Sequence, residues 1–185
     1  VVTNFKHMLL EHQEVMQSVE RLLPQLELAS AAVVSCLKSG GKIMLCGNGG
    51  SAADAQHIAA EIIGRFETER RALPAIALTT DTSILTAVGN DYGYDSIFQR
   101  QVQGLAQPGD LVIGYSTSGS SKNVINAVSE AKKAGCKVVT LTGKGGGALA
   151  EISDIDLCVD SSSTARIQEA HAFLGHALCS AIDEL

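Results

Sequence analysis

The chain has 185 residues, of which 45% are hydrophobic and 18% are charged, and its formal net charge is −6. This length suits one domain with one sizeable core. The acidic balance argues against a surface that binds nucleic acid directly or an anionic membrane, and no apolar run reaches the roughly 18 residues of a membrane-spanning helix.

The first part of the chain, residues 3–38, predicts two helices. Val15, Val19 and Leu22 follow a helical period, and a break is expected near Pro24. The second helix is an Ala- and Val-rich run over residues 28–37, which indicates burial. Two consecutive glycines at 40–41 then predict the end of the helical segment.

Beyond residue 40 the pattern changes to apolar runs that are each followed by a polar loop, in most cases with a helix after it. The predicted strands cover residues 42–46, 75–78, 111–114, 137–141 and 155–159. Helices are predicted over residues 52–66, after residue 83, up to residue 134, and from 164 to the end. This alternation predicts an α/β fold with a doubly wound five-stranded parallel sheet, of the flavodoxin-like kind. We expect a single domain over 1–185, with N-terminal helices at 1–39 and the α/β core at 40–185.

The polar loops of this predicted sheet all follow strands. Ligands of open α/β sheets bind outside the carboxyl ends of the strands, at the point where the strand order reverses. The loops at 48–51, 79–83 and 116–121 should therefore converge on one crevice.

The loop at 116–121, Ser-Thr-Ser-Gly-Ser-Ser, carries five hydroxyl groups in six positions and opens a predicted helix. Hydroxyls and free N–H groups at a helix N-terminus suit a phosphate group, although a plain Ser cap and turn is the simpler interpretation. The Gly-rich loop at 47–51 is neither a dinucleotide fingerprint nor a Walker loop, so it indicates either close approach of a ligand or only a tight turn.

Two predicted helices carry candidate acid, base and metal-binding groups. His57 and Glu61 are four residues apart and project from one face, which suits a metal or acid/base pair; alone, this spacing favours an ordinary exposed pair. On the last helix, Gln168 can share a face with His176, while His171 lies to the other side. Periodicity does not decide which of the two histidines has a chemical role.

The five cysteines are odd in number and form no C-x-x-C pair, so we expect reduced, mostly buried thiols in a cytoplasmic protein. No signal peptide is visible. The chain begins with Val rather than Met, which suggests that residues are missing before Val1.

Six motifs in order resemble those of the sugar isomerase (SIS) domain family, and more closely the phosphoheptose isomerases within it. They are Cys-Gly-Asn-Gly-Gly-Ser at 46–51, Asp-Ala-Gln-His-Ile-Ala-Ala-Glu at 54–61, Thr-Thr-Asp-Thr-Ser at 79–83, Val-Gly-Asn-Asp at 88–91, Ser-Thr-Ser-Gly at 116–119 and Ala-Arg-Ile-Gln-Glu at 165–169. The resemblance covers nearly the whole chain. Several long motifs in the correct order are far more specific than any one of them.

The resemblance implies an isomerase that converts sedoheptulose 7-phosphate to D-glycero-D-manno-heptose 7-phosphate, an early step toward the heptose of lipopolysaccharide. It implies Glu61 as catalytic base and His176 as acid, and a homotetramer whose sites draw on neighbouring subunits. It also implies one zinc ion per subunit, with the ligands His57, Glu61, Gln168 and His176. The implied substrate-binding residues are Asn48, Gly49, Gly50, Ser51, Glu61, Asn90, Asp91, Ser116, Thr117, Ser118, Ser121 and Gln168.

Two other functions share the same domain. A non-catalytic relative that binds the replication initiator resembles the chain locally, at 65–70 and 165–169. That relative lacks the groups matching Glu61 and His176, and both are present here, which favours the enzyme. A regulatory domain that binds sugar phosphate would need the Ser-rich loop but not the acid/base pair.

Overall fold

The structure is a computed structural model that describes residues 4–185. Its N-terminal segment contains α1 (Phe5–Ser18), a 3₁₀ turn η1 (Val19–Leu22) and α2 (Leu23–Lys38). The prediction of two helices is confirmed, and the break between them is the 3₁₀ turn just before Pro24. Thr3, where the first helix was expected to begin, lies outside the described residues, as do the first two residues of the expected domain.

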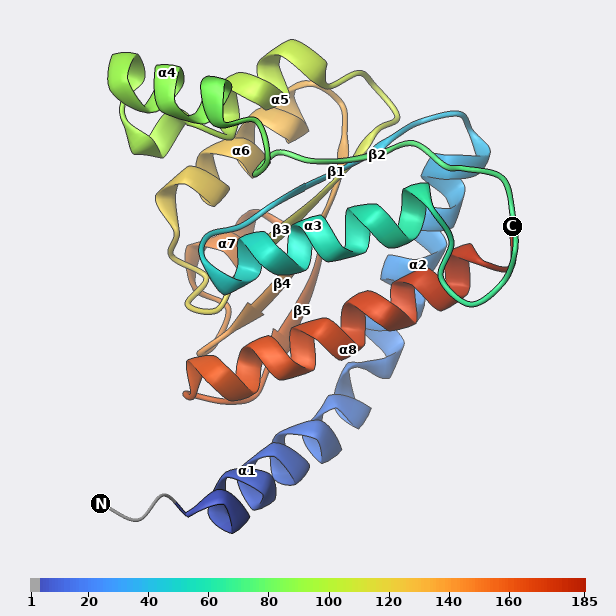
Figure 1. Ribbon diagram of the computed structural model, residues 1–185, viewed down its shortest axis with the longest axis vertical. Helices are drawn as coiled ribbons and strands as arrows, with labels where there is room; N and C mark the ends of the chain where they lie inside the picture. Colours follow the sequence, from blue (N-terminus) through green and yellow to red (C-terminus); the bar gives the residue numbers. More distant parts are fainter. Residues whose placement is uncertain (1–3) are drawn as a thin grey trace.

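The centre of the fold is a five-stranded parallel sheet (Figure 1). Its strands are β1 (Ile43–Cys46), β2 (Ala75–Ala77), β3 (Leu111–Ser116), β4 (Lys137–Gly143) and β5 (Ile155–Val159). The strand order is β2-β1-β3-β4-β5 and every neighbouring pair is parallel. The order reverses between β1 and β3, so the loops after these two strands flank the switch point. The predicted doubly wound sheet is thereby confirmed.

Helices cover both faces of the sheet because successive strand residues point to opposite sides. Ile43 and Leu45 of β1 join one core with α2, α3 (Gly50–Ile63) and α8 (Thr164–Ile182). Met44 and Cys46 join the other core. The helices that contribute to this second core are α4 (Thr82–Tyr92), α5 (Gln99–Leu105), α6 (Lys122–Lys133) and α7 (Gly147–Ile152), and a 3₁₀ turn, η2 (Tyr94–Ser96), lies between α4 and α5. The result is three layers, with α3 and α8 side by side on one face (Figure 1).

The structure differs from the sequence prediction at short elements and at boundaries. The short helices α5 and α7 and the turn η2 were not predicted, because segments of this length carry too few apolar positions to show a period. Strand β3 extends to Ser116, which was expected in the loop, and α3 ends at Ile63 rather than near Phe66.

Two further sequence expectations can be compared with the structure. All five cysteines are free thiols, and four of them are buried, while Cys158 is half-buried. Within residues 4–185, no helix is both long enough and apolar enough to cross a membrane.

Candidate active site

The hydroxyl-rich loop after β3 places several hydroxyl groups at the N-terminus of α6. Its serines form two hydroxyl pairs, Ser116 with Ser121 and Ser118 with Ser120, and each pair has an Oγ–Oγ distance of 2.8 Å. Ser121 is the N-cap of α6, but its side chain makes no capping hydrogen bond. The first N–H groups of a helix have no partner within the helix. At the start of α6 the Val124 N–H is already bound to the Ser121 carbonyl and to Asn123 Oδ1, so the N–H groups of Lys122 and Asn123 are the ones left for a phosphate group, together with the partly exposed Thr117 and Ser118.

Gly119 gives this loop its sharp turn. Its φ is +64°, in the region that favours glycine. A Cβ atom there would lie 1.8 Å from the carbonyl oxygen of Gly146, and this oxygen belongs to the backbone. The loop after β3 therefore needs glycine at position 119 to approach the loop before α7 this closely. This approach also fixes the hydroxyl groups that flank Gly119.

The loops after β1 and β3 are joined by an amide pair. Asn48 Nδ2 donates to Asn123 Oδ1 at 2.9 Å, and Asn123 Nδ2 donates back to Asn48 Oδ1 at 2.8 Å. Tyr94 also donates its hydroxyl to Asn48 Oδ1 at 3.0 Å. A cavity of about 120 Å³ beside Asn48 is lined in addition by Gly49 and Thr79. The loops after β1 and β2 therefore meet at this cavity, and Asn48 also binds the first turn of α6, which follows the loop after β3.

A cluster of one carboxylate and two imidazoles lies on α3 and α8. His57 Nε2 is 3.2 Å from Glu61 Oε1, and His176 Nε2 is 3.4 Å from His57 Nε2. Each residue offers one ligand atom, and these three atoms lie within 4.8 Å of one another. Glu61 is about one-quarter exposed, so the cluster is accessible to small molecules. The structure thus unites the i,i+4 pair of α3 with a histidine 119 residues away from His57.

The two helices run in the same direction and approach closely because of small residues at their contact. Gly50 at the start of α3 lies against the side chain of Gln168, and Ile58 lies against Gly175. A Cβ atom at Gly175 would meet Ile58 Cδ1 at 2.7 Å, so glycine permits the approach that brings the next residue, His176, to His57.

The donor set fits zinc. Zinc binds imidazole nitrogen and carboxylate oxygen at about 2.0–2.2 Å in tetrahedral geometry, which places neighbouring ligand atoms about 3.3–3.5 Å apart. The His57–Glu61 and His57–His176 separations of 3.2 and 3.4 Å are close to this spacing, and all three ligand atoms lie within 4.8 Å of one another. These three residues could therefore hold a metal ion with little rearrangement.

Gln168 is not brought to this cluster. Its amide lies against Gly50, at the opposite end of α3 from Glu61. Eleven residues separate Gly50 from Glu61, which corresponds to about 16 Å along a helix. The candidate site therefore has two parts within this chain: the loops at the carboxyl edge of the sheet with Gln168, and the His57–Glu61–His176 cluster.

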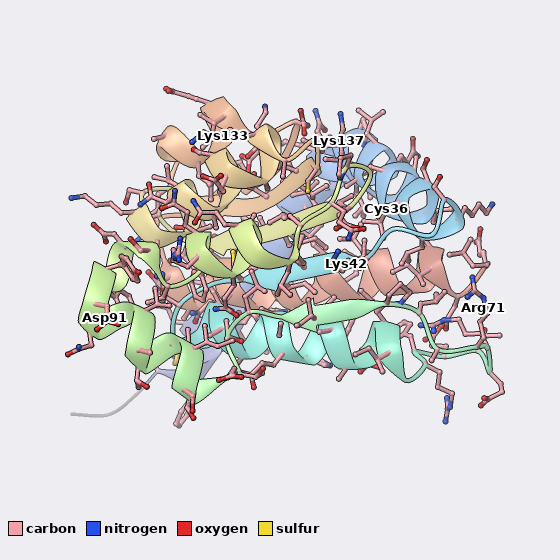
Figure 2. The ribbon with its side chains drawn as sticks, turned by 90° about the horizontal axis from the view of Figure 1, so that it is seen from above. Cys36, Lys42, Arg71, Asp91, Lys133 and Lys137 are labelled. Atoms are coloured by element: carbon pink, nitrogen blue, oxygen red, sulfur yellow. The ribbon has the colours of Figure 1, made fainter. Side chains whose placement is uncertain are left out.

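The remaining predicted residues lie at the start of α3 and near the end of α4. Ser51 is buried in the first turn of α3 and donates its N–H to the Asn48 carbonyl at 3.0 Å. Asn90 and Asp91 are exposed near the end of α4, and Asn90 Nδ2 donates to Asp91 Oδ1 at 2.8 Å. Asp91 lies at the opposite side of the molecule from Arg71 (Figure 2). The structure thus leaves this pair far from the loop that follows α3.

The two histidines of α8 have different environments. His171 is completely buried, and its Nε2 atom lies 2.9 Å from the Thr142 carbonyl oxygen. Burial lowers the pKa of His171 to about 4, although the contact with Thr142 favours the charged form. His171 is therefore neutral near pH 7 and structural, whereas His176 joins the candidate site. Sequence reasoning missed Phe66, whose ring centre lies 5.2 Å from that of His176, and no spacing signal could have revealed it.

The 2-1-3-4-5 parallel sheet with a hydroxyl-rich loop after β3 defines an α/β protein of the SIS class, and the family model described as the SIS domain matches residues 9–143. A phosphoheptose isomerase from a Nitratiruptor species is 59% identical over 95% of each chain. One from Campylobacter concisus is 57% identical over 98% of this chain and 96% of its own. The solved structure of a phosphoheptose isomerase from Neisseria gonorrhoeae has a TM-score of 0.93 and 46% identity, covering 98% of this chain and 97% of that one. The chain therefore belongs to the phosphoheptose isomerase family of SIS-domain proteins, a family of isomerase enzymes, and the resemblance seen in its motifs is confirmed.

Proposed function

We propose that this enzyme converts sedoheptulose 7-phosphate to D-glycero-D-manno-heptose 7-phosphate. The observation that carries this proposal is the His57–Glu61–His176 cluster, which puts a carboxylate and an imidazole at one accessible point. The names of the relatives at 57–59% identity support the substrate class.

The reaction moves a proton between two neighbouring carbon atoms and needs one base and one acid. Glu61 removes a proton from C1 of the ketose while His176 donates a proton to the C2 carbonyl oxygen, which gives an enediol. The protonated Glu61 then returns its proton to C2, and His176 regains a proton from the C1 hydroxyl as the aldehyde forms. Protons and electrons balance without a redox cofactor.

Glu61 and His176 each have a second polar side-chain atom that does not face His57. Glu61 uses Oε1 and His176 uses Nε2 toward His57, which leaves Oε2 and Nδ1 for proton transfer. Zinc held by His57, Glu61 and His176 would polarise the carbonyl or hydroxyl oxygens of the sugar. Gln168, proposed as a fourth ligand and as a substrate contact, lies eight residues, or about 12 Å along α8, from His176, so moving its amide away from Gly50 would not bring it to the cluster of the same chain.

The substrate phosphate is proposed to bind the loop after β3, and the sugar hydroxyls to contact the loop after β1. The substrate-binding set remains Asn48, Gly49, Gly50, Ser51, Glu61, Asn90, Asp91, Ser116, Thr117, Ser118, Ser121 and Gln168. Hydroxyl groups and helix N–H donors suit a dianion without a lysine or arginine side chain.

The two-part site supports a homotetramer with shared active sites. About 16 Å along α3 separates Gly50, directly after the β1 loop, from Glu61, so one chain holds the proposed sugar-binding loop and the catalytic base well apart. A neighbouring copy that supplies one of the two parts would complete the site. We also propose that the enzyme acts in the cytoplasm and that its product leads to the heptose of lipopolysaccharide.

Replacing Ser118 and Ser121 together by Ala is expected to raise KM for sedoheptulose 7-phosphate by about ten- to a hundredfold. The estimate assumes that each hydroxyl contributes one hydrogen bond of ordinary net strength, about 0.5–1.5 kcal/mol. Steady-state kinetics with the phosphorylated ketose measures the change. The matched control replaces the exposed Ser162 and Ser180 by Ala, which should leave KM unchanged. An unaltered KM in the Ser118/Ser121 double variant would remove the phosphate cradle from the proposal.

A further inference from the structure

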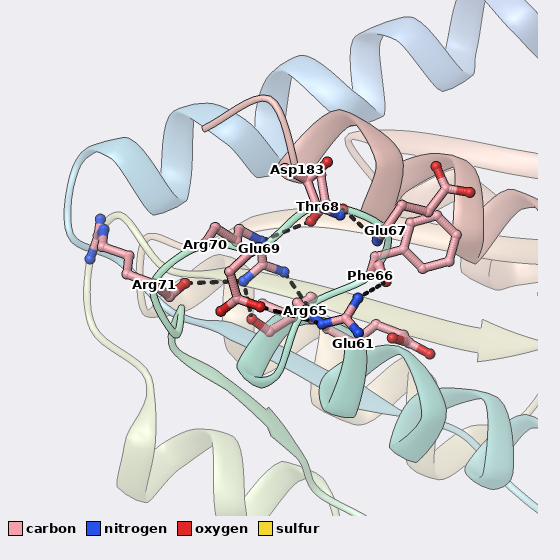
Figure 3. Close-up of polar contacts among 10 residues, drawn as sticks. Glu61, Arg65, Phe66, Glu67, Thr68, Glu69, Arg70, Arg71 and Asp183 are labelled. Carbon is pink, nitrogen blue, oxygen red and sulfur yellow. Dashed lines mark hydrogen bonds and ion pairs between the residues drawn. The ribbon is translucent and has the colours of Figure 1, made fainter.

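A buried ion pair connects the loop after α3 to the end of α8. Arg70 Nε donates to Asp183 Oδ1 at 2.9 Å, and the two side chains are only 7% and 6% exposed. Asp183 Oδ2 also accepts the backbone N–H groups of Glu67 and Thr68, at 2.6 and 2.7 Å (Figure 3). One carboxylate thus fastens the loop over residues 64–74 to the C-cap of α8.

The remaining guanidinium donors hold the end of α3. Arg70 Nη2 donates to the Glu61 carbonyl oxygen, and Nη1 donates to the Ile62 carbonyl oxygen, both at 2.9 Å. Because α3 ends at Ile63, these carbonyls belong to the last turn, where no helical N–H group can bind them. Arg70 therefore caps the very turn that carries the Glu61 side chain.

The same loop also contacts His176. Phe66, directly before the two residues whose N–H groups bind Asp183, packs its ring against the His176 imidazole at 5.2 Å between ring centres. The loop thus touches one cluster residue through Arg70 and another through Phe66.

We propose that Arg70 and Asp183 are positioning residues, which fix the last turn of α3 and the end of α8 so that Glu61, His57 and His176 meet. The expected effect on kcat rests on the proposed function. The expected effect on the arrangement of Glu61, His57 and His176 does not depend on turnover. The planar guanidinium is essential because it reaches one carboxylate and two carbonyls at once, which the single ammonium of lysine does not.

The pair remains ionised under working conditions. Burial alone would raise the pKa of Asp183, but hydrogen bonds from Thr68, Glu67 and Arg70 outweigh it and hold this pKa below its ordinary value. The contribution of Asp183 to stability is therefore complete above about pH 4, its unfolded pKa, and is lost as the pH falls through the lower folded value.

The test compares Arg70→Lys and Asp183→Asn with a matched control, Asp110→Asn. Asp110 is equally buried, receives the backbone N–H groups of Lys42 and Gln107, and pairs with the Lys42 ammonium. It precedes β3, at the opposite edge of the sheet from the ligand loops, so its loss should lower stability without altering the cluster.

Three quantities are measured at a temperature at which circular dichroism shows every variant folded: the histidine ring signals in NMR spectra, the zinc dissociation constant by titration calorimetry, and the kinetics with sedoheptulose 7-phosphate. Both pair variants should shift the His57 and His176 signals, weaken zinc binding by about 10–100-fold and lower kcat by about 10–100-fold with little change in KM. Asp110→Asn should change none of the three.

Unchanged histidine signals in the two pair variants, or equal changes in Asp110→Asn, would overturn the positioning role. An inactive wild-type enzyme whose histidine signals still shift in the pair variants would contradict the proposed function and leave the positioning role supported.

Discussion

Replacing Glu61 by Gln is expected to lower kcat for sedoheptulose 7-phosphate by about 10²–10⁴-fold, the usual contribution of a general base. The amide has nearly the shape of the carboxylate but no basic oxygen to accept the carbon-bound proton. Glu61 is about one-quarter exposed and its side chain contacts only His57 among the described polar groups, at 3.2 Å. The variant should therefore fold and still bind the phosphosugar.

Glu69→Gln provides the control, because Glu69 lies in the nearby loop with its side chain 88% exposed and pairs only with Arg65 among the described residues. Its kcat should equal that of the wild type. Steady-state kinetics and a binding titration with the ketose phosphate distinguish chemistry from binding. Turnover close to the wild-type rate in Glu61→Gln would refute the assignment of the base.

Replacing His176 by Gln is expected to reduce kcat by about 10²–10⁴-fold, because the acid that protonates the carbonyl oxygen is lost. Zinc affinity should fall by at least about tenfold. Removing a residue that only hydrogen-bonds to a metal ligand already weakens metal binding by about that much, and removing the ligand itself should weaken it at least as strongly. The 3.4 Å separation between the imidazoles of His57 and His176 is the basis for both effects.

The control for this variant is His7→Gln, because His7 is exposed on α1 and pairs only with Glu11 among the described side chains. Kinetics and zinc titration of both proteins separate the local effect from a general one. If zinc affinity fell while kcat stayed at the wild-type value, His176 would be a ligand and not the acid.

Much of the fold was visible in the sequence because each buried strand is followed by a polar loop. The strand order was part of the predicted flavodoxin-like class, whereas the short helices α5 and α7 were not predicted, since elements of six or seven residues leave no periodic signal. The sequence also misplaced Ser116, whose hydroxyl belongs to the loop although its backbone continues β3.

At the site, the resemblance grouped His57, Glu61 and His176 with Gln168 as ligands of one ion, and in this chain the structure brings only the first three together. The His57–Glu61 pair follows from helix geometry, whereas the choice of His176 over His171 depends on burial in the packed protein. The Arg70–Asp183 contact joins residues 113 positions apart and required the structure. The separation of the phosphate loop from the acid/base cluster also required the structure. This separation depends on the direction in which α3 runs away from the carboxyl edge of the sheet.

The most direct test of the account incubates the purified enzyme with sedoheptulose 7-phosphate, with and without added zinc, and follows the sugar carbons by NMR. The account predicts that signals of the aldose, D-glycero-D-manno-heptose 7-phosphate, appear as those of the ketose decline, and that Glu61→Gln abolishes the conversion. A folded protein that leaves the ketose unchanged under both conditions would contradict it, and would favour a protein that binds sugar phosphate or the replication initiator without catalysis.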